Sequence, residues 1–195
     1  MEFTIRLGSP TEFKALQDIE HASDECFASV GMPEIFETGN VTAIEDLQHA
    51  LNRQNLWVAA DASNQPIGWA MSIPIDAGLH NEQMCVLPRC QRQGIGKTLF
   101  SARIAYARAA GFERVTVSTF LNVPWNAPTY ERWGYRIMKD HELTPDLRQI
   151  QKHEIEHGLI GDKRVVMAYD LSPTTSPKTS NDDKPTGTGK EGTAI

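Results

Sequence analysis

The sequence predicts an α/β fold in which helices flank a central twisted sheet of mixed strand direction. Two observations support this prediction. Segments with the period of a strand alternate with segments of helical period, in the order βααβββαβαβαβ. Three consecutive strands near the middle lie close enough to form an antiparallel meander, whereas the later strands are separated by helices and predict parallel crossovers.

The amino-terminal segments predict one strand and two helices. Residues 3–7 alternate between apolar and polar positions, as a strand does. Ser9 and Glu12 have the spacing of a capping box at the start of the first helix. Thr42 and Glu45 repeat that spacing at the start of the second helix, whose apolar positions form one face.

The remaining segments complete the sheet and its helices. Strands are expected at 56–60, 67–73, 79–87 and 114–120, from 135 onward and at 164–171. Helices are expected after the glycine-rich turn as far as Gly111, in a short segment stopped by Gly134, and at 145–157. From residue 172 the chain is rich in Ser, Thr, Pro, Gly, Asp and Lys and has almost no apolar residues. Such a segment cannot offset its ordering entropy. We therefore expect one domain over residues 1–171 and a disordered tail over 172–195.

Composition excludes several classes of protein. The 195 residues are 40% hydrophobic, and no apolar run approaches membrane-spanning length. A net charge of −6 argues against a nucleic-acid partner. The three cysteines, Cys26, Cys85 and Cys90, are odd in number and are not spaced as a metal clamp, so we expect no metal site and a reduced, cytoplasmic setting.

The segment from Met84 to Phe100 is the centre of the sequence. A strand-like run closed by Pro88 leads into a basic, glycine-rich turn and then into a helix. The unpaired N–H groups and the dipole at such a helix start bind phosphate. Gly94 and Gly96 let the backbone approach a ligand, and neighbouring arginine and lysine side chains add positive charge.

The spacing of this turn distinguishes between phosphate-binding loops. A Walker A loop requires glycine where Gln91 stands, and a dinucleotide fingerprint requires glycine where Leu99 stands. The pattern Gln91-x-x-Gly94-x-Gly96 instead resembles motif A of the GCN5-related N-acetyltransferases (GNAT). That resemblance implies that the pyrophosphate of acetyl-CoA is bound by a run of loop residues: Gln91, Arg92, Gln93, Gly94, Ile95, Gly96 and Lys97.

A second segment, Asn126 to Tyr135, is similar to another acetyltransferase motif, with Tyr130 and Gly134 in matching places. The resemblance implies that Tyr130 binds the cofactor and protonates the departing coenzyme A thiolate. The alternative for Tyr130 is simple packing of the short helix on the sheet. Where the family usually has a cofactor-binding Asn, this chain has Val123, and either Asn122, one residue away, or Asn126 could take that role.

The resemblance also implies the path of the pantetheine arm. In the GNAT fold two adjacent parallel strands splay apart, and the arm pairs with the backbone of the first strand. In this chain that backbone belongs to Met84, Cys85 and Val86. The apolar neighbours of Cys85 indicate a small buried residue rather than a nucleophile.

The implied reaction is direct attack of an amine on the acetyl thioester, which needs a proton acceptor. Glu82, four residues before Val86, is the first candidate for this base, and His80 is the second. The alternative for Glu82 is a carboxylate in a polar strand end.

The acceptor is expected to be a small cationic amine, or else an amino group of a peptide. The first 54 residues contain ten acidic and three basic residues, and acidic side chains beside a cofactor site attract cations. The alternative is that these carboxylates are solvated helix faces. The candidates for acceptor binding are Glu25, Phe27 and His80. Dimers are common in the family, so a homodimer is one assembly to test.

Two other functions stay open. The first is a regulatory GNAT relative that binds acetyl-CoA without turnover. The second is a zinc hydrolase, because His153-Glu-Ile-Glu-His157 matches the His-Glu-x-x-His signature and a helix would bring both imidazoles to one face. A third ligand at the expected spacing is missing, and the segment is heavily charged, as a solvated surface helix would be.

Overall fold

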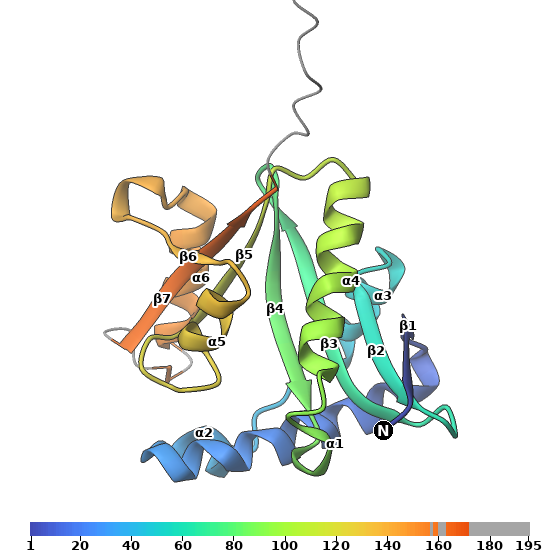
Figure 1. The fold of residues 1–195 in the computed structure, drawn as a ribbon. Coiled ribbons are helices and arrows are strands. Elements are labelled where there is room, and N and C mark those ends of the chain that lie inside the picture. Colours follow the sequence, from blue (N-terminus) through green and yellow to red (C-terminus); the bar gives the residue numbers. More distant parts are fainter. Residues whose placement is uncertain (157, 160–162, 172–195) are drawn as a thin grey trace, which may run out of the picture.

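The computed structural model describes residues 1–156, 158–159 and 163–171, and this part of the chain forms a mixed sheet between two layers of helices (Figure 1). The strands lie in the order β1-β2-β3-β4-β5-β7-β6, and only β4 and β5 are parallel neighbours. The α/β prediction is confirmed. The strands are β1 (Phe3–Leu7), β2 (Leu56–Asp61), β3 (Pro66–Ile75), β4 (Gly78–Val86), β5 (Arg114–Phe120), β6 (Arg136–Ile137) and β7 (Arg164–Asp170).

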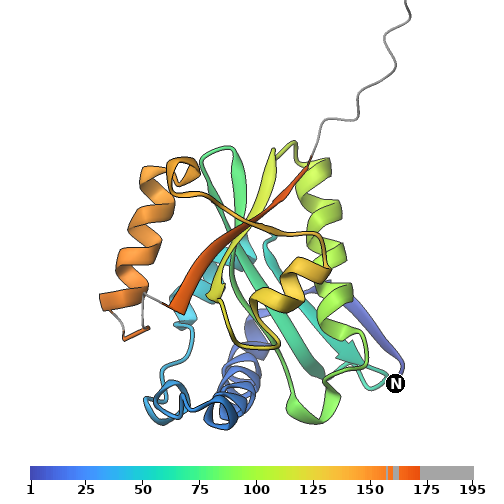
Figure 2. The same cartoon turned by 60° about the vertical axis from the view of Figure 1, so that its left-hand side comes forward.

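The helices divide between the two faces of the sheet, as Figures 1 and 2 show. One layer holds α4 (Ile95–Ala109) and α5 (Ala127–Arg132), and the other holds α1 (Phe13–Asp24), α3 (Ile44–Asn52) and α6 (Pro145–Glu156). The short helix α2 (Glu34–Glu37) follows α1. Short 3₁₀ segments connect these elements, among them η1 (Pro10–Glu12), η2 (Glu25–Val30), η3 (Pro88–Cys90) and η4 (Asp140–Glu142).

Each central strand contributes to both layers, because successive side chains point to opposite faces. On β3, Trp69 and Met71 pack with α1 and α3, whereas Ala70 between them packs with α4. Trp69 is completely buried, and its indole N–H donates to the Leu16 carbonyl of α1 at 2.8 Å. The core is therefore continuous through the sheet.

The sheet splits between β4 and β5. Their parallel pairing begins at Gly78 and ends where Asn81 faces Val117. Beyond that point β4 stays paired with β3, and β5 stays paired with β7, so the two strands diverge like the arms of a V (Figure 1). The edge of β4 from Glu82 to Val86 consequently has no strand beside it on the β5 side.

A β-bulge lies at the point of divergence. Asn81 faces Ser72 and Gln83 faces Met71, so Glu82 is an extra residue with no partner in β3. A bulge bends its strand and re-aims the following side chains. Here it directs both Glu82 and Gln83 toward the side of the sheet covered by α1, α3 and α6, where Gln83 bonds to Glu20 of α1.

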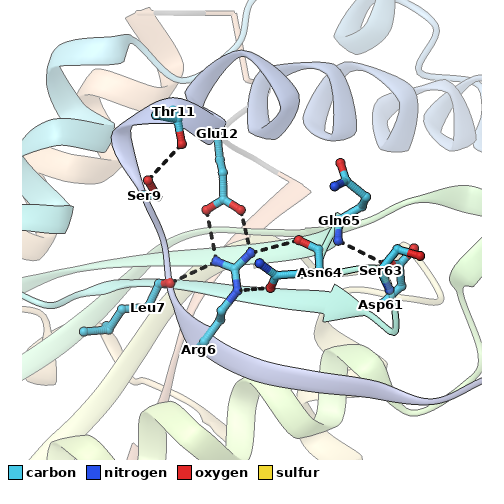
Figure 3. Close-up of polar contacts among 9 residues, drawn as sticks. All are labelled: Arg6, Leu7, Ser9, Thr11, Glu12, Asp61, Ser63, Asn64 and Gln65. Carbon is cyan, nitrogen blue, oxygen red and sulfur yellow. Dashed lines mark hydrogen bonds and ion pairs between the residues drawn. The ribbon is translucent and has the colours of Figure 1, made fainter.

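The two predicted capping boxes are not present. Glu12 does not return to the backbone of Ser9; its carboxylate binds the Arg6 guanidinium at 2.6 and 3.0 Å (Figure 3). Arg6 also donates to Asn64 in the β2–β3 turn, so it joins β1, η1 and that turn (Figure 3).

The second helix begins two residues later than its predicted cap. Thr42 lies outside α3, and both its backbone N–H and its hydroxyl donate to the Glu20 carboxylate. An ion pair replaces the first cap and a charge–dipole contact replaces the second, because a carboxylate gains more from several strong donors than from one helix N–H.

The predicted tail over 172–195 lies outside the described residues, and so does His157. Among the residues described, no helix is both long and apolar enough to span a bilayer.

Candidate active site

The turn between β4 and α4 presents an open helix start. α4 begins at Ile95 after Gly94, whose φ of +85° is one that glycine adopts without strain. A Cβ at Gly94 would meet no atom within 4 Å, so the backbone conformation, and not crowding, requires glycine here. No side chain caps the helix, which leaves its first N–H groups available to an anion.

The side chains of the turn take two different roles. Gln91 and Gln93 donate to the backbone carbonyls of Val86 and Arg89, at 3.1 and 3.3 Å, and so brace the loop itself. The Arg92 and Lys97 side chains are exposed and add positive charge around the open N–H groups, while Ile95 is buried beneath them.

The open edge of β4 carries the three predicted pantetheine contacts. Cys85 is buried in the core beneath α1, so only its backbone faces the split. Met84 and Val86 pack on the α4 side. The Met84 N–H donates to the Gln83 side-chain oxygen at 2.8 Å, so an amide oxygen already occupies the position that a ligand carbonyl would take.

Tyr130 of α5 reaches the point where the sheet splits. Its buried hydroxyl accepts a long hydrogen bond, 3.5 Å, from the Asn81 side chain, and its ring packs edge-on against Trp133 and Tyr135. Burial raises the pKa of Tyr130, although Arg103 and Arg164 oppose that shift. The phenol is therefore protonated at neutral pH and can donate.

The start of α5 explains how the predicted asparagine loop is built. Asn126 precedes the helix and accepts from the N–H groups of Thr129 and Tyr130 through its backbone carbonyl. Val123, where the family pattern has Asn, is buried against Met32 and Phe120. Within the described part of the chain the Asn126 side chain makes no hydrogen bond, so its amide remains available to a ligand.

The two candidate bases differ sharply in their surroundings. His80 is completely enclosed, bonds to the Thr116 hydroxyl at 2.9 Å, and has its pKa lowered to about 3 by burial and by Arg164 and Arg103. Glu82 keeps solvent-exposed surface, yet protein atoms crowd its carboxyl. This desolvation, with the nearby Glu154 and Asp46 carboxylates, raises the pKa of Glu82 to about 7.

More carboxylates lie on the same side of the sheet. Glu20 is 4% exposed and binds Thr42 and Gln83, and burial raises its pKa. Burial, with Glu20 nearby, also raises the pKa of Asp24 to about 7. Glu25, the predicted acceptor residue, is exposed and makes no hydrogen bond or ion pair with a described residue.

An aromatic cluster occupies the gap between η2 and the end of β5. The ring of Phe27, a predicted acceptor residue, lies 5.7 Å from those of Phe120 and Trp125. Arg164 stacks over Phe120 at 4.7 Å and binds the Glu154 carboxylate. These contacts make a mixed apolar and charged wall beside Glu82.

Glu154, the glutamate of the His-Glu-x-x-His segment, is bound by other residues of this wall. Glu154 accepts from the Ser118 hydroxyl at 2.6 Å and from the Arg164 guanidinium. That ion pair gives Glu154 a structural partner in place of a metal-bound water. Within the described residues, no three His, Cys, Asp or Glu side chains are grouped for a metal ion, and His157 lies outside them.

Sequence reasoning missed three polar residues of the split. Arg103 on α4 is 0% exposed, Asn81 is 3% exposed, and Gln83 bridges β4 to Glu20. The signal for Arg103 was visible: it stands four residues after Leu99 and four before Ala107, on the apolar stripe of the helix.

The split sheet, the uncapped helix after the glycine turn, and the tyrosine at the split together define a coenzyme A-dependent acyltransferase. The family profile described as Acetyltransferase (GNAT) family matches residues 16–135, and the chain belongs to this family. GNAT enzymes use acetyl-CoA as their acyl donor. The residues here fit that donor, because the open N–H groups at the start of α4 could bind its pyrophosphate and the open edge of β4 could pair with its amide-bearing arm.

Solved structures share the fold. The chain resembles the PaiA N-acetyltransferase of Thermoplasma acidophilum, solved with coenzyme A, with a TM-score of 0.63 and 16% identity over 87% of this chain and 99% of that one. It also resembles N-acetylglutamate synthase of Neisseria gonorrhoeae, solved with coenzyme A and N-acetyl-glutamate. The TM-score is 0.66 and the identity 15%, over 89% of this chain and 36% of that one. With the ribosomal-protein-S18-alanine N-acetyltransferase of Escherichia coli the TM-score is 0.59 and the identity 15%, over 90% of this chain and 98% of that one.

Proposed function

We propose that this protein transfers the acetyl group of acetyl-CoA to the primary amine of a small cationic acceptor by direct attack. One observation carries the proposal: an acid and a base flank the point where the sheet splits. Asn81, the last paired residue, bonds to the Tyr130 hydroxyl on the α5 side. The next residue, Glu82, presents a carboxyl with a pKa of about 7 toward the opposite side.

The roles of the donor-side residues follow from their positions. The N–H groups after Gly94 bind the pyrophosphate, with Arg92 and Lys97 adding charge. The backbone of Met84 and Val86 pairs with the pantetheine arm once the Gln83 amide has moved aside. Acetyl-CoA supplies an activated acyl group with a thiolate leaving group, and Tyr130 gives that thiolate its proton.

The base is Glu82. An alkylammonium group must lose a proton before it can attack, and a carboxylate with a pKa of about 7 is half-ionised near neutral pH and matched to that task. His80 is less suited, because a group with a pKa of about 3 has little affinity for the proton and is enclosed. It serves instead as packing beneath the split, bonded to Thr116.

The acceptor class rests on charge. Several carboxylates lie toward the same side of the sheet: Glu20, Asp24, Asp46, Glu82 and Glu154. Burial raises the pKa of Asp24 and Glu82, and repulsion from the neighbouring carboxylates adds to that shift. A cation placed among them relieves this repulsion. A polyamine, an aminoglycoside or a dipeptide-like amine has the required charge, and Phe27 offers an apolar surface beside it.

Binding of acetyl-CoA is the first test. Isothermal titration compares the wild type with Gly94→Glu, whose carboxylate repels pyrophosphate and whose backbone is strained at positive φ. The matched control is Gly111→Glu, because Gly111 has a φ of +80°, has equally open surroundings and lies just beyond the other end of α4.

We expect Gly94→Glu to lose about tenfold or more in affinity while Gly111→Glu binds as the wild type does. Loss of binding in both variants would mean that strain, and not the site, is responsible. Thiol release over a panel of amines then identifies the acceptor. A wild type that binds acetyl-CoA but releases no thiol with any amine would favour the non-catalytic alternative.

A further inference from the structure

Arg103 is a charged residue with no charged partner in the core. It lies on the buried stripe of α4, and none of its surface is exposed. A fully buried guanidinium costs several kcal/mol unless an anion accompanies it. Among the described residues no carboxylate forms an ion pair with Arg103, so the fold carries an uncompensated positive charge at this position.

The unused donors of Arg103 all lie on one edge. Its Nη1 contacts the Met84 sulfur at 3.6 Å, a weak acceptor. Among the described residues its Nε and Nη2 make no hydrogen bond of full geometry, and their polar neighbour is the Tyr135 hydroxyl, with which Arg103 makes only a weaker side-chain interaction. These two atoms form the side edge of the guanidinium, where paired N–H groups match the two oxygens of a carboxylate.

Two phenols add donors beside that edge. The Tyr135 hydroxyl is buried, interacts with Arg103 and donates its own proton to no described residue, and the Tyr130 hydroxyl accepts from Asn81 and so retains its own proton. The two rings lie 5.2 Å apart. Arg103 interacts electrostatically with both phenols, and burial keeps their pKa raised. Donors therefore outnumber acceptors, and one acceptor, Asn81 Oδ1, is also unsatisfied.

This cluster lies along the path assigned to the acyl donor, and in that respect the inference rests on the proposed function. The pyrophosphate site is at the start of α4, and Arg103 follows Gly96 by about two turns, roughly 10 Å, on the same helix. Met84, which Arg103 contacts, belongs to the open edge of β4. The Tyr130 hydroxyl marks the position of the thioester sulfur.

We propose that Arg103 and Tyr135 bind a carboxylate at the far end of the acyl group, so that the protein accepts coenzyme A thioesters of short dicarboxylic acids, such as malonyl-CoA and succinyl-CoA, in addition to acetyl-CoA. The methyl of an acetyl group leaves the Arg103 edge unpaired. The departing thiolate is a poorer partner for Arg103, because it is charged only briefly during turnover and presents one sulfur atom to two parallel N–H donors. A terminal carboxylate matches both donors throughout the bound state.

The transfer itself is unchanged. Glu82 takes one proton from the ammonium group, the neutral amine nitrogen attacks the thioester carbonyl, and the C–N bond forms as the C–S bond breaks. Tyr130 gives its proton to the thiolate, and the second proton lost by the amine nitrogen restores the phenol. The product is an amide that ends in a carboxylate.

The test is calorimetric binding of coenzyme A, acetyl-CoA, malonyl-CoA and succinyl-CoA to the wild type, to Arg103→Met and to Tyr135→Phe. We expect at least one dicarboxylic thioester to bind the wild type about tenfold or more tightly than acetyl-CoA. Arg103→Met should remove that preference, and Tyr135→Phe should reduce it. Acyl-free coenzyme A reports on the pyrophosphate end alone.

The outcomes separate the two proposals. If no coenzyme A species binds the wild type, the proposed function fails. If acetyl-CoA binds but neither dicarboxylic thioester binds more tightly, or if Arg103→Met keeps the preference, the carboxylate site is wrong while the acetyltransferase proposal stands. If Arg103→Met does not fold, the wild-type affinities and Tyr135→Phe still decide the question.

Discussion

Glu82 acquires its chemistry from an irregularity of the backbone. The bulge turns its carboxyl toward a side of the sheet that already holds Glu154 and Asp46, where desolvation first and these carboxylates second raise its pKa to about 7. An ordinary glutamate on a regular strand would titrate near pH 4. The proton affinity of the proposed base is therefore a product of local geometry.

The raised pKa of Glu82 predicts the pH dependence of the reaction. Because the base must be ionised, kcat/KM should rise with pH through an apparent pKa near 7, a limb distinct from deprotonation of the free amine at higher pH. Glu82→Gln should remove this limb and lower kcat about 100-fold. The exposed Glu45→Gln is the control; an unchanged limb in Glu82→Gln would assign the base elsewhere.

Tyr130 is predicted to act on turnover and not on donor affinity. Tyr130→Phe keeps the ring packing against Trp133 and Tyr135 but removes the proton donor. We expect kcat to fall about 100-fold while the Kd for acetyl-CoA changes less than threefold. Steady-state kinetics and calorimetry measure the two quantities, with Tyr106→Phe on α4 as control. An unaltered kcat would leave Tyr130 with a packing role only.

At the scale of the single residue, the sequence predicts candidate residues where the chemistry depends on position along the chain. The glycine turn and Tyr130 are recognisable because their spacing is local. Arg103 and Gln83 were missed because their importance comes from what surrounds them: one has no anion nearby, and the other covers the Met84 N–H. Neither property is written in a short window of sequence.

Among the elements, the first strand and its helix are joined by a buried charge pair. Arg6 bonds to Glu12 with both η nitrogens, and the two side chains are 27% and 14% exposed. The pair Lys14–Asp18 on α1 is 80% and 62% exposed. Partly buried, bidentate pairs stabilise a fold more than single exposed ones.

These two ion pairs give a matched test of stability. Arg6→Met should lower the free energy of unfolding by about 1 to 2 kcal/mol, because Glu12 and Asn64 lose their donors together. Lys14→Met should change it by less than about 0.5 kcal/mol. Urea denaturation measures both. Equal effects would show that the cluster in Figure 3 contributes no more than a surface pair.

Element prediction failed where long-range contacts outcompeted local ones. Ser9 with Glu12 and Thr42 with Glu45 have the spacing of capping boxes. In the folded chain, however, Glu12 forms an ion pair with Arg6, and Thr42 donates hydrogen bonds to Glu20. A capping pattern states what a helix start could do in isolation. Which partner prevails depends on charges brought close only by the folded chain.

Across the whole molecule, the two halves of the sheet are joined by a short parallel ladder that ends at Asn81 and Val117. The order of strands and helices was predictable, because hydrophobic periodicity and connection length limit how the chain crosses the sheet. The split itself was expected only from the family resemblance. The residue pattern of β4 and β5 does not change where their pairing stops, so the sequence pattern alone does not reveal the split.

A ligand that spans the split should stabilise the molecule as a whole. Coenzyme A at about 100 times its Kd should raise the free energy of unfolding by about 2.7 kcal/mol. Amide hydrogen exchange should slow most at residues 82–86 and at the start of α4. Stabilisation without added protection on β4 would place the ligand outside the split.

The bond between Gln83 and the Met84 N–H has one more consequence, for self-association. An unpaired strand edge is a template on which the strand of another chain can add, and here such an edge lies inside the sheet. By folding its amide back onto the strand, Gln83 covers one donor of that edge whenever no ligand is present. A single side chain thus leaves one donor fewer on this edge for the strand of another chain.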